Sequence, residues 1–304
     1  MGYKIQTLDK KDWPPLLSEI NDPPKSLNYA GEIPDYDRKF LAVVGARKYS
    51  QYGKDAVSTL LEGLSGFPIT IVSGLALGID SLAHRAAIKN NLPTIAIPGS
   101  GLSPEALHPA THISLAEEII QSGGTLMSEY EPDFKATQWS FPQRNRIMAG
   151  MCNATLIVEA ETKSGTLITA KLATGYNRDV LVVPGSIFSP NSDGPHLLLK
   201  LGATPIRNSD DLLEALHIST LDLNMNNEKV PLRSKKGSSA GLKKYSDCSE
   251  KEMLLIKILE TPKPRDEVIR EASNTISVSE IQTTLTILEI KGLVEEKLGE
   301  MRLT

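Results

Sequence analysis

The chain has 304 residues, of which 40% are hydrophobic and 23% charged, and its formal net charge is −4. This length allows one large α/β domain and a smaller unit, and the apolar fraction is sufficient for a packed core, which excludes a chain that is disordered throughout. No apolar run approaches the roughly 18 residues that a membrane span requires, so we expect no membrane partner. Cys152 and Cys248 are too few for a disulfide framework and have no neighbours at metal-ligand spacing. We therefore expect a cytoplasmic protein without a metal or other cofactor.

The distribution of charge argues against a broad basic surface. Residues 1–217 contain 19 Lys and Arg against 23 Asp and Glu, residues 218–249 contain 6 against 3, and residues 250–304 contain 8 against 11. A nucleic-acid site must therefore be a local arrangement of arginines and backbone donors.

One pattern repeats from residue 39 to residue 216: a short apolar run ends in a Gly, Ser or Pro cluster, and a helical stretch usually follows. The runs that we predict as strands are residues 40–44, 69–72, 94–97, 125–127, 154–158 and 180–183. They are continuous and rich in Val and Ile, which is typical of strands buried on both faces. The stretches that we predict as helices are residues 53–64, 79–89, 115–121, 166–174 and 210–216. This alternation predicts an α/β fold, with an extended Rossmann-like, doubly wound, mostly parallel sheet over residues 39–217.

Three further regions flank this domain. Residues 1–38 are a lead-in segment, in which two Pro-Pro pairs favour extended turns. Residues 218–249 lose periodicity and fill with Asn, Lys, Ser and Gly, which predicts a flexible linker. For residues 250–304 we predict helices at 250–260, 266–272 and 279–291 and a hairpin-like tail at 293–303. Three helices with a β-ribbon predict a small C-terminal winged-helix domain.

The loops after the predicted strands are expected to carry the chemistry, because ligands of an open parallel sheet bind outside the carboxyl ends of its strands. Five of these loops contain Gly and small residues that expose backbone N–H groups, and a following helix N-terminus adds partial positive charge. A single loop of this kind is most simply a tight turn, and Lys48 and Lys163 are most simply solvated charges. Five such loops at one edge nevertheless predict a ligand with several phosphates, or a phosphodiester chain. The candidate residues in these loops are Gly45, Arg47, Lys48, Ser73, Gly74, Gly78, Asp80, Gly99, Gly101, Lys163, Ser164, Gly165 and Thr166.

Two nucleotide-binding signatures are absent from the sequence. No G-x-x-x-x-G-K-[ST] motif occurs, because residues 162–166 have similar letters in a different order, and no G-x-G-x-x-G follows the first predicted strand. We therefore expect neither ATP hydrolysis nor a dinucleotide cofactor.

The segment 139–148, just before a predicted helical stretch, has the most informative composition. It reads Trp-Ser-Phe-Pro-Gln-Arg-Asn-Arg-Ile-Met and supplies the candidates Phe141, Arg144, Asn145 and Arg146. Aromatic faces stack unpaired bases and guanidinium groups hold phosphates, whereas duplex DNA hides its base faces, so this mixture favours single strands. An alternative remains open, in which the arginines form a network with carboxylates and the phenylalanine packs in the core. The carboxylates available for it are Glu129, Glu131 and Glu159.

Asp80 and His84 lie four residues apart on one face of a predicted helix, a spacing that would permit an acid–base pair. A histidine near a helix start that is hydrogen-bonded to an aspartate is more often structural. We therefore predict no catalytic residue.

A set of motifs in a fixed order identifies a resemblance. The motifs are residues 44–47, 73–84, 141–150, 158–160, 163–170, 183–186 and 201–203. Together they resemble the DNA-processing protein A (DprA/Smf) family over roughly residues 12–217, and the C-terminal region resembles the winged-helix domain of that family. The resemblance implies a bacterial homodimer, not an enzyme, that binds single-stranded DNA. It further implies that the protein loads the recombinase RecA onto incoming strands in natural transformation and displaces single-strand-binding protein.

The resemblance also implies roles for individual residues. Arg47 would grip a phosphate, Phe141 would line the path of the strand with Arg144 and Arg146, and the loops at 73–78 and 164–166 would add contacts. Ala46 replaces the serine that is usual in the family, and residues 107–109 read Leu-His-Pro where the family usually continues towards Tyr-Pro. The lead-in is also too short for the N-terminal SAM-like domain of many members.

Two other functions stay open at this point. One is a nucleotide-binding enzyme similar to the phosphoribohydrolases that cleave nucleoside monophosphates, although residues 98–102 lack the second Gly and the Thr of their Pro-Gly-Gly-x-Gly-Thr loop. The other is a sensor that binds a small nucleotide without turning it over.

In the C-terminal region, residues 280–291 offer only Lys291 as a basic residue, so we predict that this domain does not read duplex DNA and instead serves protein contact or dimer support.

Overall fold

The computed structural model describes residues 3–218, 249–259, 263–273, 275–291, 293–297 and 300–303. Its contacts divide the chain into two compact units, Met1–Val230 and Pro231–Thr304, which we describe separately. Nearly all of the predicted linker, together with Cys248, lies outside the described residues. Within the described parts of the chain, no helix is long and apolar enough to cross a membrane.

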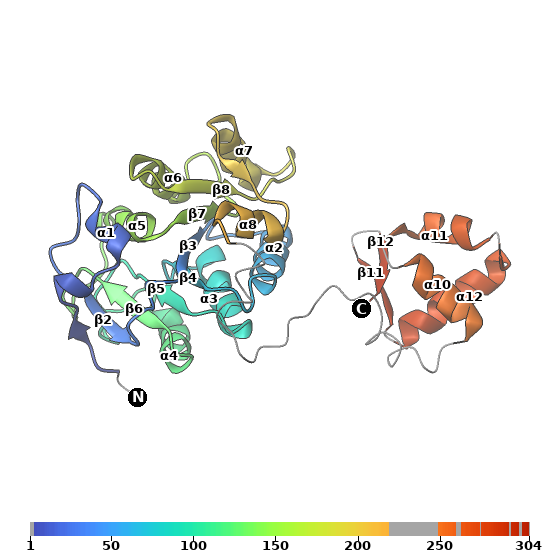
Figure 1. Ribbon diagram of the computed structural model, residues 1–304, viewed down its shortest axis with the longest axis horizontal. Coiled ribbons are helices and arrows are strands. Elements are labelled where there is room, and N and C mark those ends of the chain that lie inside the picture. Colours follow the sequence, from blue (N-terminus) through green and yellow to red (C-terminus); the bar gives the residue numbers. More distant parts are fainter. Residues whose placement is uncertain are drawn as a thin grey trace. The chain divides into compact units, whose positions relative to one another are not determined.

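The larger unit is built on a nine-stranded sheet with the order β1-β2-β6-β5-β4-β3-β7-β8-β9 (Figure 1). The strands are β1 (Gln6–Thr7), β2 (Asn28–Gly31), β3 (Lys39–Val44), β4 (Ile69–Ser73), β5 (Thr94–Ala96), β6 (Thr125–Ser128), β7 (Ala154–Ile157), β8 (Asp179–Val182) and β9 (Thr204–Pro205). Strands β3 to β9 pair in parallel, whereas β2 is antiparallel to both β6 and β1. This arrangement confirms the predicted α/β fold class.

The strand order reverses direction at β3. From β3 the chain runs through β4 and β5 to β6 on one side, and it then returns to place β7, β8 and β9 on the other side. Loops that follow β3 and β7 therefore leave the sheet towards opposite faces, which opens a crevice at the carboxyl ends of these two strands.

Helices cover both faces of the sheet. They are α1 (Pro15–Ser18), α2 (Gln51–Glu62), α3 (Ile79–Lys89), α4 (Ile113–Gln121), α5 (Ser140–Met151), α6 (Gly165–Gly175), α7 (Asp193–Lys200) and α8 (Ser209–Ala215). Leu41 and Val43 of β3 share one apolar core with α2, α3 and α8, while Phe40, Ala42 and Val44 share another with α1, α5 and α6. Because alternate residues of one strand supply two cores, nearly every residue of that strand has to be apolar.

Several elements differ from the sequence prediction. The lead-in was expected to form extended turns, but it adds β1, β2 and the short helix α1 to the domain. Helix α7 and strand β9 were not predicted. Helix α5 begins at Ser140, so residues 140–148 of the segment lie within this helix and not before it, and Trp139 is its N-cap residue. Pro142 is tolerated there because the first-turn N–H groups of a helix have no intrahelical partner.

In the smaller unit, the described residues form three helices, α10 (Glu250–Ile258), α11 (Arg265–Ala272) and α12 (Val278–Ile290). They pack with a three-stranded antiparallel sheet of order β10-β12-β11, made of β10 (Lys263–Pro264), β12 (Glu300–Leu303) and β11 (Val294–Lys297). Ser249 and Ser277 begin two of the helices with capping boxes. The three helices and the hairpin lie where the sequence predicts them, and the winged-helix assignment of this unit stays a prediction.

Candidate functional site

A cavity of about 440 Å³ lies at the carboxyl ends of β3 and β7, where the strand order reverses. We call it the switch-point pocket. Its walls are the loop after β3, the loop before α6 and the first turns of α5 and α3. The predicted site residues that line it are Gly45, Arg47, Lys48, Asp80, Phe141, Arg144, Asn145, Lys163, Ser164, Gly165 and Thr166. A second hollow of about 40 Å³ shares Arg47, Phe141 and Arg144 with it and adds Gly74.

The rim of the switch-point pocket carries three exposed cations, Arg47, Lys48 and Lys163. None of the three has a carboxylate partner among the residues that the structure describes. Glu161 is the exposed acidic residue of the same rim. Three cations without an ion-pair partner around one hollow, against one exposed carboxylate, favour an anionic ligand, because such a ligand would offset their mutual repulsion.

The helix N-termini at the pocket differ in whether a carboxylate already occupies them. At α2, the buried Glu159 accepts hydrogen bonds from the Ser50 backbone N–H (2.9 Å) and from the Ser50 hydroxyl (2.5 Å). At α3, the first turn contains the buried Asp80, which accepts from the Gly74 N–H at 3.0 Å. Helix α6 has no acidic residue in its first turn, and only the Ser164 hydroxyl caps it. Of these three N-termini, that of α6 can therefore still accept an anion from outside, and α5, whose first turn also lines the pocket, likewise has no acidic residue there.

Arg144 is buried behind the pocket and holds two loops together. Its Nη1 donates to the carbonyl oxygen of Gly74 at 2.5 Å and to that of Ile97, and its Nε donates to Asn145 Oδ1 at 3.1 Å. Burial lowers the pKa of Arg144 to about 10, and the negative charge of Asp80 limits this lowering. The guanidinium therefore stays charged at neutral pH. Burial likewise raises the pKa of Asp80, and the charge of Arg144 limits that rise. The fixed positive charge of Arg144 thus lies just beneath the cavity surface.

Phe141 presents a half-buried ring to both hollows. The guanidinium carbon of Arg47 lies 5.6 Å from the ring centroid, and the His108 ring centroid lies 5.4 Å from it. Gly99 makes room for this ring, because a Cβ at residue 99 would lie 2.6 Å from Phe141 Cδ1. The ring is thereby fixed beside the cations of the rim.

Five predicted site residues support the loops without lining the switch-point pocket. The hydroxyl of Ser73 donates to the Val43 carbonyl at 2.6 Å inside the sheet. Gly78 has a φ of +87°, and a side chain there would run into the backbone of Ala46 and Arg47. Gly101 donates its N–H to the Phe134 carbonyl at 2.8 Å. The remaining two are Gly74, which is held by Asp80 and Arg144, and Gly99.

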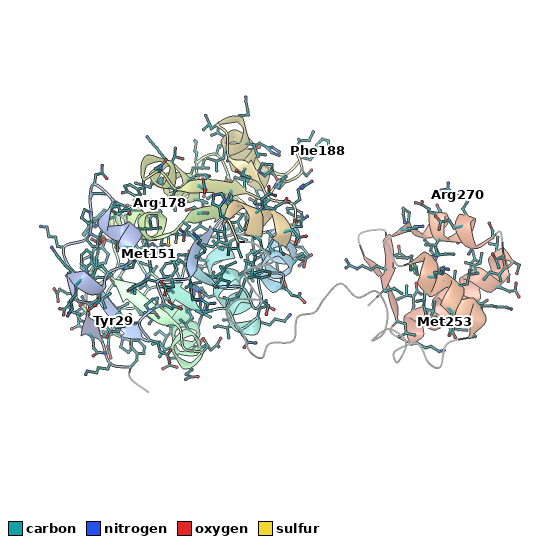
Figure 2. The ribbon with its side chains drawn as sticks, viewed as in Figure 1. Tyr29, Met151, Arg178, Phe188, Met253 and Arg270 are labelled. Atoms are coloured by element: carbon teal, nitrogen blue, oxygen red, sulfur yellow. The ribbon has the colours of Figure 1, made fainter. Side chains whose placement is uncertain are left out.

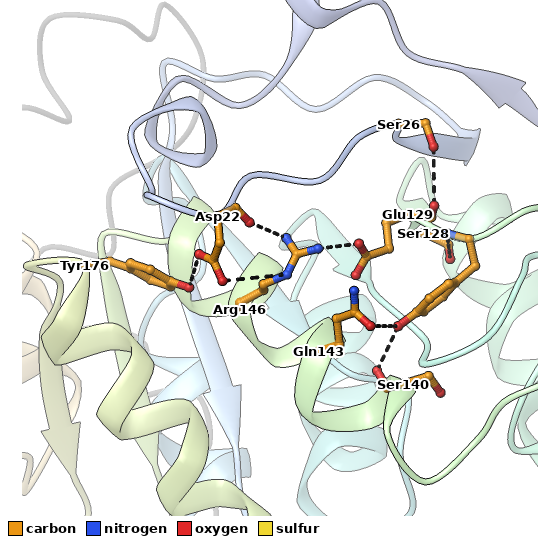
Figure 3. A network of polar contacts seen from close by, with 9 residues as sticks. Asp22, Ser26, Ser128, Glu129, Ser140, Gln143, Arg146 and Tyr176 are labelled. Carbon is orange, nitrogen blue, oxygen red and sulfur yellow. Dashed lines mark hydrogen bonds and ion pairs between the residues drawn. The ribbon is translucent and has the colours of Figure 1, made fainter.

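Arg146 does not lie where the sequence prediction placed it. Its side chain is 10% exposed, forms an ion pair with Glu129 and donates to the Asp22 carbonyl at 2.8 Å (Figure 3). Burial raises the pKa of Glu129, and the charge of Arg146 opposes this rise. The carboxylate network, which the residues alone left open, is thus what the structure shows for Arg146. Its place between α5 and the lead-in corrects the expectation that it lines the path of a strand.

The possible acid–base pair of Asp80 and His84 is not formed. His84 is fully buried, and its Nδ1 contacts the Thr94 hydroxyl at 2.8 Å, while Asp80 binds Gly74. Burial lowers the pKa of His84 to about 3, so this imidazole is neutral in the folded protein. Nor do any three His, Cys, Asp or Glu side chains gather as metal ligands within the described residues.

Sequence reasoning named Glu159 only as a partner for the arginines and did not name Asn191, so the supporting roles of both residues were missed. Glu159 organises the loop that carries Arg47, and Asn191 Nδ2 donates to the Lys48 carbonyl at 3.2 Å. An isolated acidic residue directly after a predicted apolar strand was a signal for Glu159. Asn191 offered no such signal, because it belongs to a loop whose position depends on the whole fold.

A family model described as DNA recombination-mediator protein A matches residues 4–217. The chain belongs to the DNA-processing protein A family. Protein Smf of Escherichia coli is 40% identical over 215 residues, which are 71% of this chain and 57% of that protein, so the match spans less than two thirds of that relative. Among solved structures, DNA processing protein A of Streptococcus pneumoniae is 37% identical with a TM-score of 0.64, covering 70% of this chain and 74% of that one. The Helicobacter pylori protein, described by its single-stranded DNA binding mode, is 31% identical with a TM-score of 0.63, covering 71% and 96%.

Proposed function

We propose that this member of the DNA-processing protein A family binds single-stranded DNA in the switch-point pocket. The observation that carries the proposal is the joint presence of three unpaired cations, an open helix N-terminus and the Phe141 ring around one cavity. Cations and helix N–H groups bind phosphates, and an aromatic face binds a base only when that base is unpaired. The single-stranded DNA binding of the Helicobacter pylori relative supports the same assignment.

The proposed contacts fall into two groups. Arg47, Lys48 and Lys163 approach phosphates together with the backbone N–H of Gly165, since the N–H of Thr166 already donates to the Ser164 hydroxyl. Phe141 stacks a base, and Asn145 offers a side-chain amide to a base edge or sugar. Arg144 contributes through its buried charge and through the loop that it holds at Gly74.

The test is fluorescence anisotropy with labelled oligo-dT and with a duplex of the same length, measured across a salt series. We expect tighter binding of the single strand and a steep fall in affinity as the salt concentration rises. Equal or tighter binding of the duplex contradicts the proposal. Absence of binding to either DNA by the folded protein points instead to a small nucleotide as the ligand, and incubation with nucleoside monophosphates then distinguishes turnover from binding alone.

We further propose that the protein acts in the cytoplasm as a mediator and not as an enzyme. It would load RecA onto the bound strand and displace single-strand-binding protein. Family membership supports this role, because the matched family is described as a recombination mediator. A strand-exchange assay with RecA, single-strand-binding protein and limiting amounts of this protein tests it. We expect the lag that single-strand-binding protein imposes to shorten, and an unchanged lag contradicts the proposed loading.

We also propose a homodimer, with residues 218–249 as a linker to a winged-helix domain. The larger unit exposes large apolar side chains around α7, among them Ile187, Leu201 and Phe188, which is 91% exposed (Figure 2). Large apolar side chains with this much exposure are candidates for a contact surface. Light scattering should give twice the chain mass of 33.1 kDa for the wild type. A Phe188→Ser/Leu201→Ser variant should give the mass of one chain, and an unchanged dimer would place the contact elsewhere.

A further inference from the structure

Three aromatic side chains gather outside the switch-point pocket, at the start of α5. The rings of Tyr130 and Phe134 are stacked, with centroids 4.3 Å apart and an interplanar angle of 15°. Trp139 meets both rings edge-on, at 6.0 Å from Tyr130 and 5.7 Å from Phe134. Although Tyr130 is 9% exposed, Trp139 is 55% exposed. We call these three residues the aromatic platform.

Hydrogen bonds fix the platform to both neighbouring elements. The Tyr130 hydroxyl donates to the Ser140 carbonyl at 3.2 Å and lies 3.4 Å from Gln143 Oε1, which ties it to α5 (Figure 3). The Gly101 N–H donates to the Phe134 carbonyl at 2.8 Å, which ties the platform to the loop after β5. A Cβ at Gly101 would run into the carbonyls of Glu131 and Pro132, so only glycine permits this approach. The exposed indole is therefore held on a rigid support.

We propose that Trp139 stacks an unpaired base of the same DNA strand that occupies the switch-point pocket. The inference rests on the proposed function and extends it to a second base-binding site that neither hollow includes. Trp139 is the N-cap residue of α5, two residues before Phe141, so their Cα atoms are at most about 7 Å apart. The two side chains diverge, since Trp139 packs on Tyr130 and Phe134 while Phe141 packs beside Arg47, so a strand that contacts both rings has to pass over the first turn of α5. Aromatic rings at successive positions are how proteins track a single strand.

The charges around the platform favour a base and not a phosphate. The exposed residues Glu131, Asp133 and Lys135 flank it, so the loop has no net positive charge. Phosphate contacts would be repelled by the two carboxylates, whereas stacking on a π-face is insensitive to them. The platform should therefore contribute affinity without adding to the salt dependence of binding.

Tryptophan fluorescence of the full-length protein tests the proposal directly. The chain contains two tryptophans, and the other one, Trp13, is buried at 6% exposure with its indole N–H bound to the Leu8 carbonyl. The neutral quencher acrylamide should therefore act mainly on Trp139 in the free protein. We expect oligo-dT to lower the emission and to protect the remaining emission from acrylamide, with no such effect from the duplex. Trp139→Phe should remove both responses.

Affinities of matched variants separate stacking from simple apolar contact. Trp139→Phe keeps an aromatic face and should bind oligo-dT within about twofold of the wild type. Trp139→Leu keeps apolar bulk without a π-face and should bind at least about fivefold more weakly, with an unchanged salt slope. A Trp139→Leu affinity within twofold of the wild type overturns the proposal, as does an altered salt slope. A Trp139→Leu variant that loses its dimer mass shows instead that the platform is an interface between copies.

The outcomes also distinguish this proposal from the proposed function. If the wild type fails to bind oligo-dT at all, the DNA-binding assignment of the pocket fails and the platform proposal fails with it. If the wild type binds and Arg47→Ala weakens binding, while oligo-dT leaves the emission and quenching of Trp139 unchanged, only the platform proposal fails.

Discussion

The Arg47 guanidinium and the Phe141 ring face one hollow, with the guanidinium carbon 5.6 Å from the ring centroid. One residue belongs to the loop after β3 and the other to α5, so the contact joins two walls of the switch-point pocket. A cation beside a ring gains a modest attraction of its own. In the DNA-bound state, we expect a phosphate to pair with the Arg47 guanidinium and a base to stack on the Phe141 ring.

Replacing Arg47 by alanine should weaken binding of oligo-dT and reduce its salt dependence. Loss of one phosphate contact lowers the slope of log affinity against log salt by about 0.7 for a single strand. Anisotropy titrations at several salt concentrations measure both quantities. Arg85→Ala is the matched control, because Arg85 is an exposed arginine of α3 paired with Glu118 at 3.4 Å. A full wild-type slope in Arg47→Ala would show that Arg47 does not contact phosphate.

Gly99→Ala should impair DNA binding without unfolding the protein. The new Cβ would lie 2.6 Å from Phe141 Cδ1, so the ring has to leave its place beside Arg47. We expect a loss of oligo-dT affinity comparable to that of Phe141→Ala, which is about 1–3 kcal/mol for one stacked base. Gly175→Ala serves as the control, since a Cβ at that helical position meets nothing within 4 Å and should leave both affinity and stability intact or improve stability slightly. Wild-type binding by Gly99→Ala would argue against a role for the Phe141 ring.

His84 should lower the free energy of unfolding of the larger unit between pH 8 and pH 5, whereas the raised pKa values of Asp80 and Glu129 act in the opposite direction. The pKa of this buried histidine is lowered to about 3 from an ordinary value near 6.5. Below pH 6.5 the unfolded chain therefore takes up a proton that the folded protein does not, and stability is lost as the pH falls towards 3. The loss from this residue at pH 5 is about 2 kcal/mol. Urea unfolding at the two pH values measures the free energy of unfolding from which this loss is obtained.

Two variants isolate this contribution. His84→Gln removes the titrating group and retains a side chain that can bind the Thr94 hydroxyl, so the difference in stability between pH 8 and pH 5 should shrink by about 2 kcal/mol. His217→Asn, at an exposed position with a φ of +55° that asparagine tolerates, should leave the difference unchanged. An equal pH dependence in the wild type and His84→Gln contradicts the assignment.

Removal of residues 249–304 should leave the affinities for duplex and single-stranded DNA unchanged. The exposed part of α12 includes Gln282, Thr283, Thr286 and Ile287, none of which is basic. A duplex-reading helix needs cations for the phosphates on either side of the groove. Anisotropy with a chain ending at residue 248, which keeps the basic residues of 218–248, tests this prediction. A marked loss of duplex affinity in that truncated chain would show that the smaller unit reads DNA.

The strands of the larger domain were predictable because burial on both faces requires continuous apolar runs. The predicted bounds of β3 and β7, for example, differ by one residue from those in the structure. Strand β2 carried no comparable signal. Its residues read Asn-Tyr-Ala-Gly, and they form a strand because β6 offers an antiparallel partner, which is a tertiary effect.

The loops and the helix α5 of the candidate site differ in what the sequence could predict about them. Loops that follow parallel strands meet at one edge of the sheet whatever their sequence. Arg47 and Lys163 could therefore be assigned to one site from the order of strands and loops along the chain. The roles of Arg144 and Arg146 depend on where α5 begins. The two arginines are two residues apart on the helix, so their side chains point about 200° apart. Arg144 therefore lies behind the pocket, whereas Arg146 faces the lead-in.

The sheet ends on both sides in strands of two residues, β1 (Gln6–Thr7) and β9 (Thr204–Pro205). Such short edges leave few backbone groups unpaired, and Pro205 has no N–H to offer a further strand. These edges therefore offer few free backbone N–H and C=O groups to which a β-strand of a second copy or of an unfolded chain could hydrogen-bond. Self-association of the larger unit through a continuous intermolecular sheet is therefore disfavoured, which leaves contacts between side chains as its route.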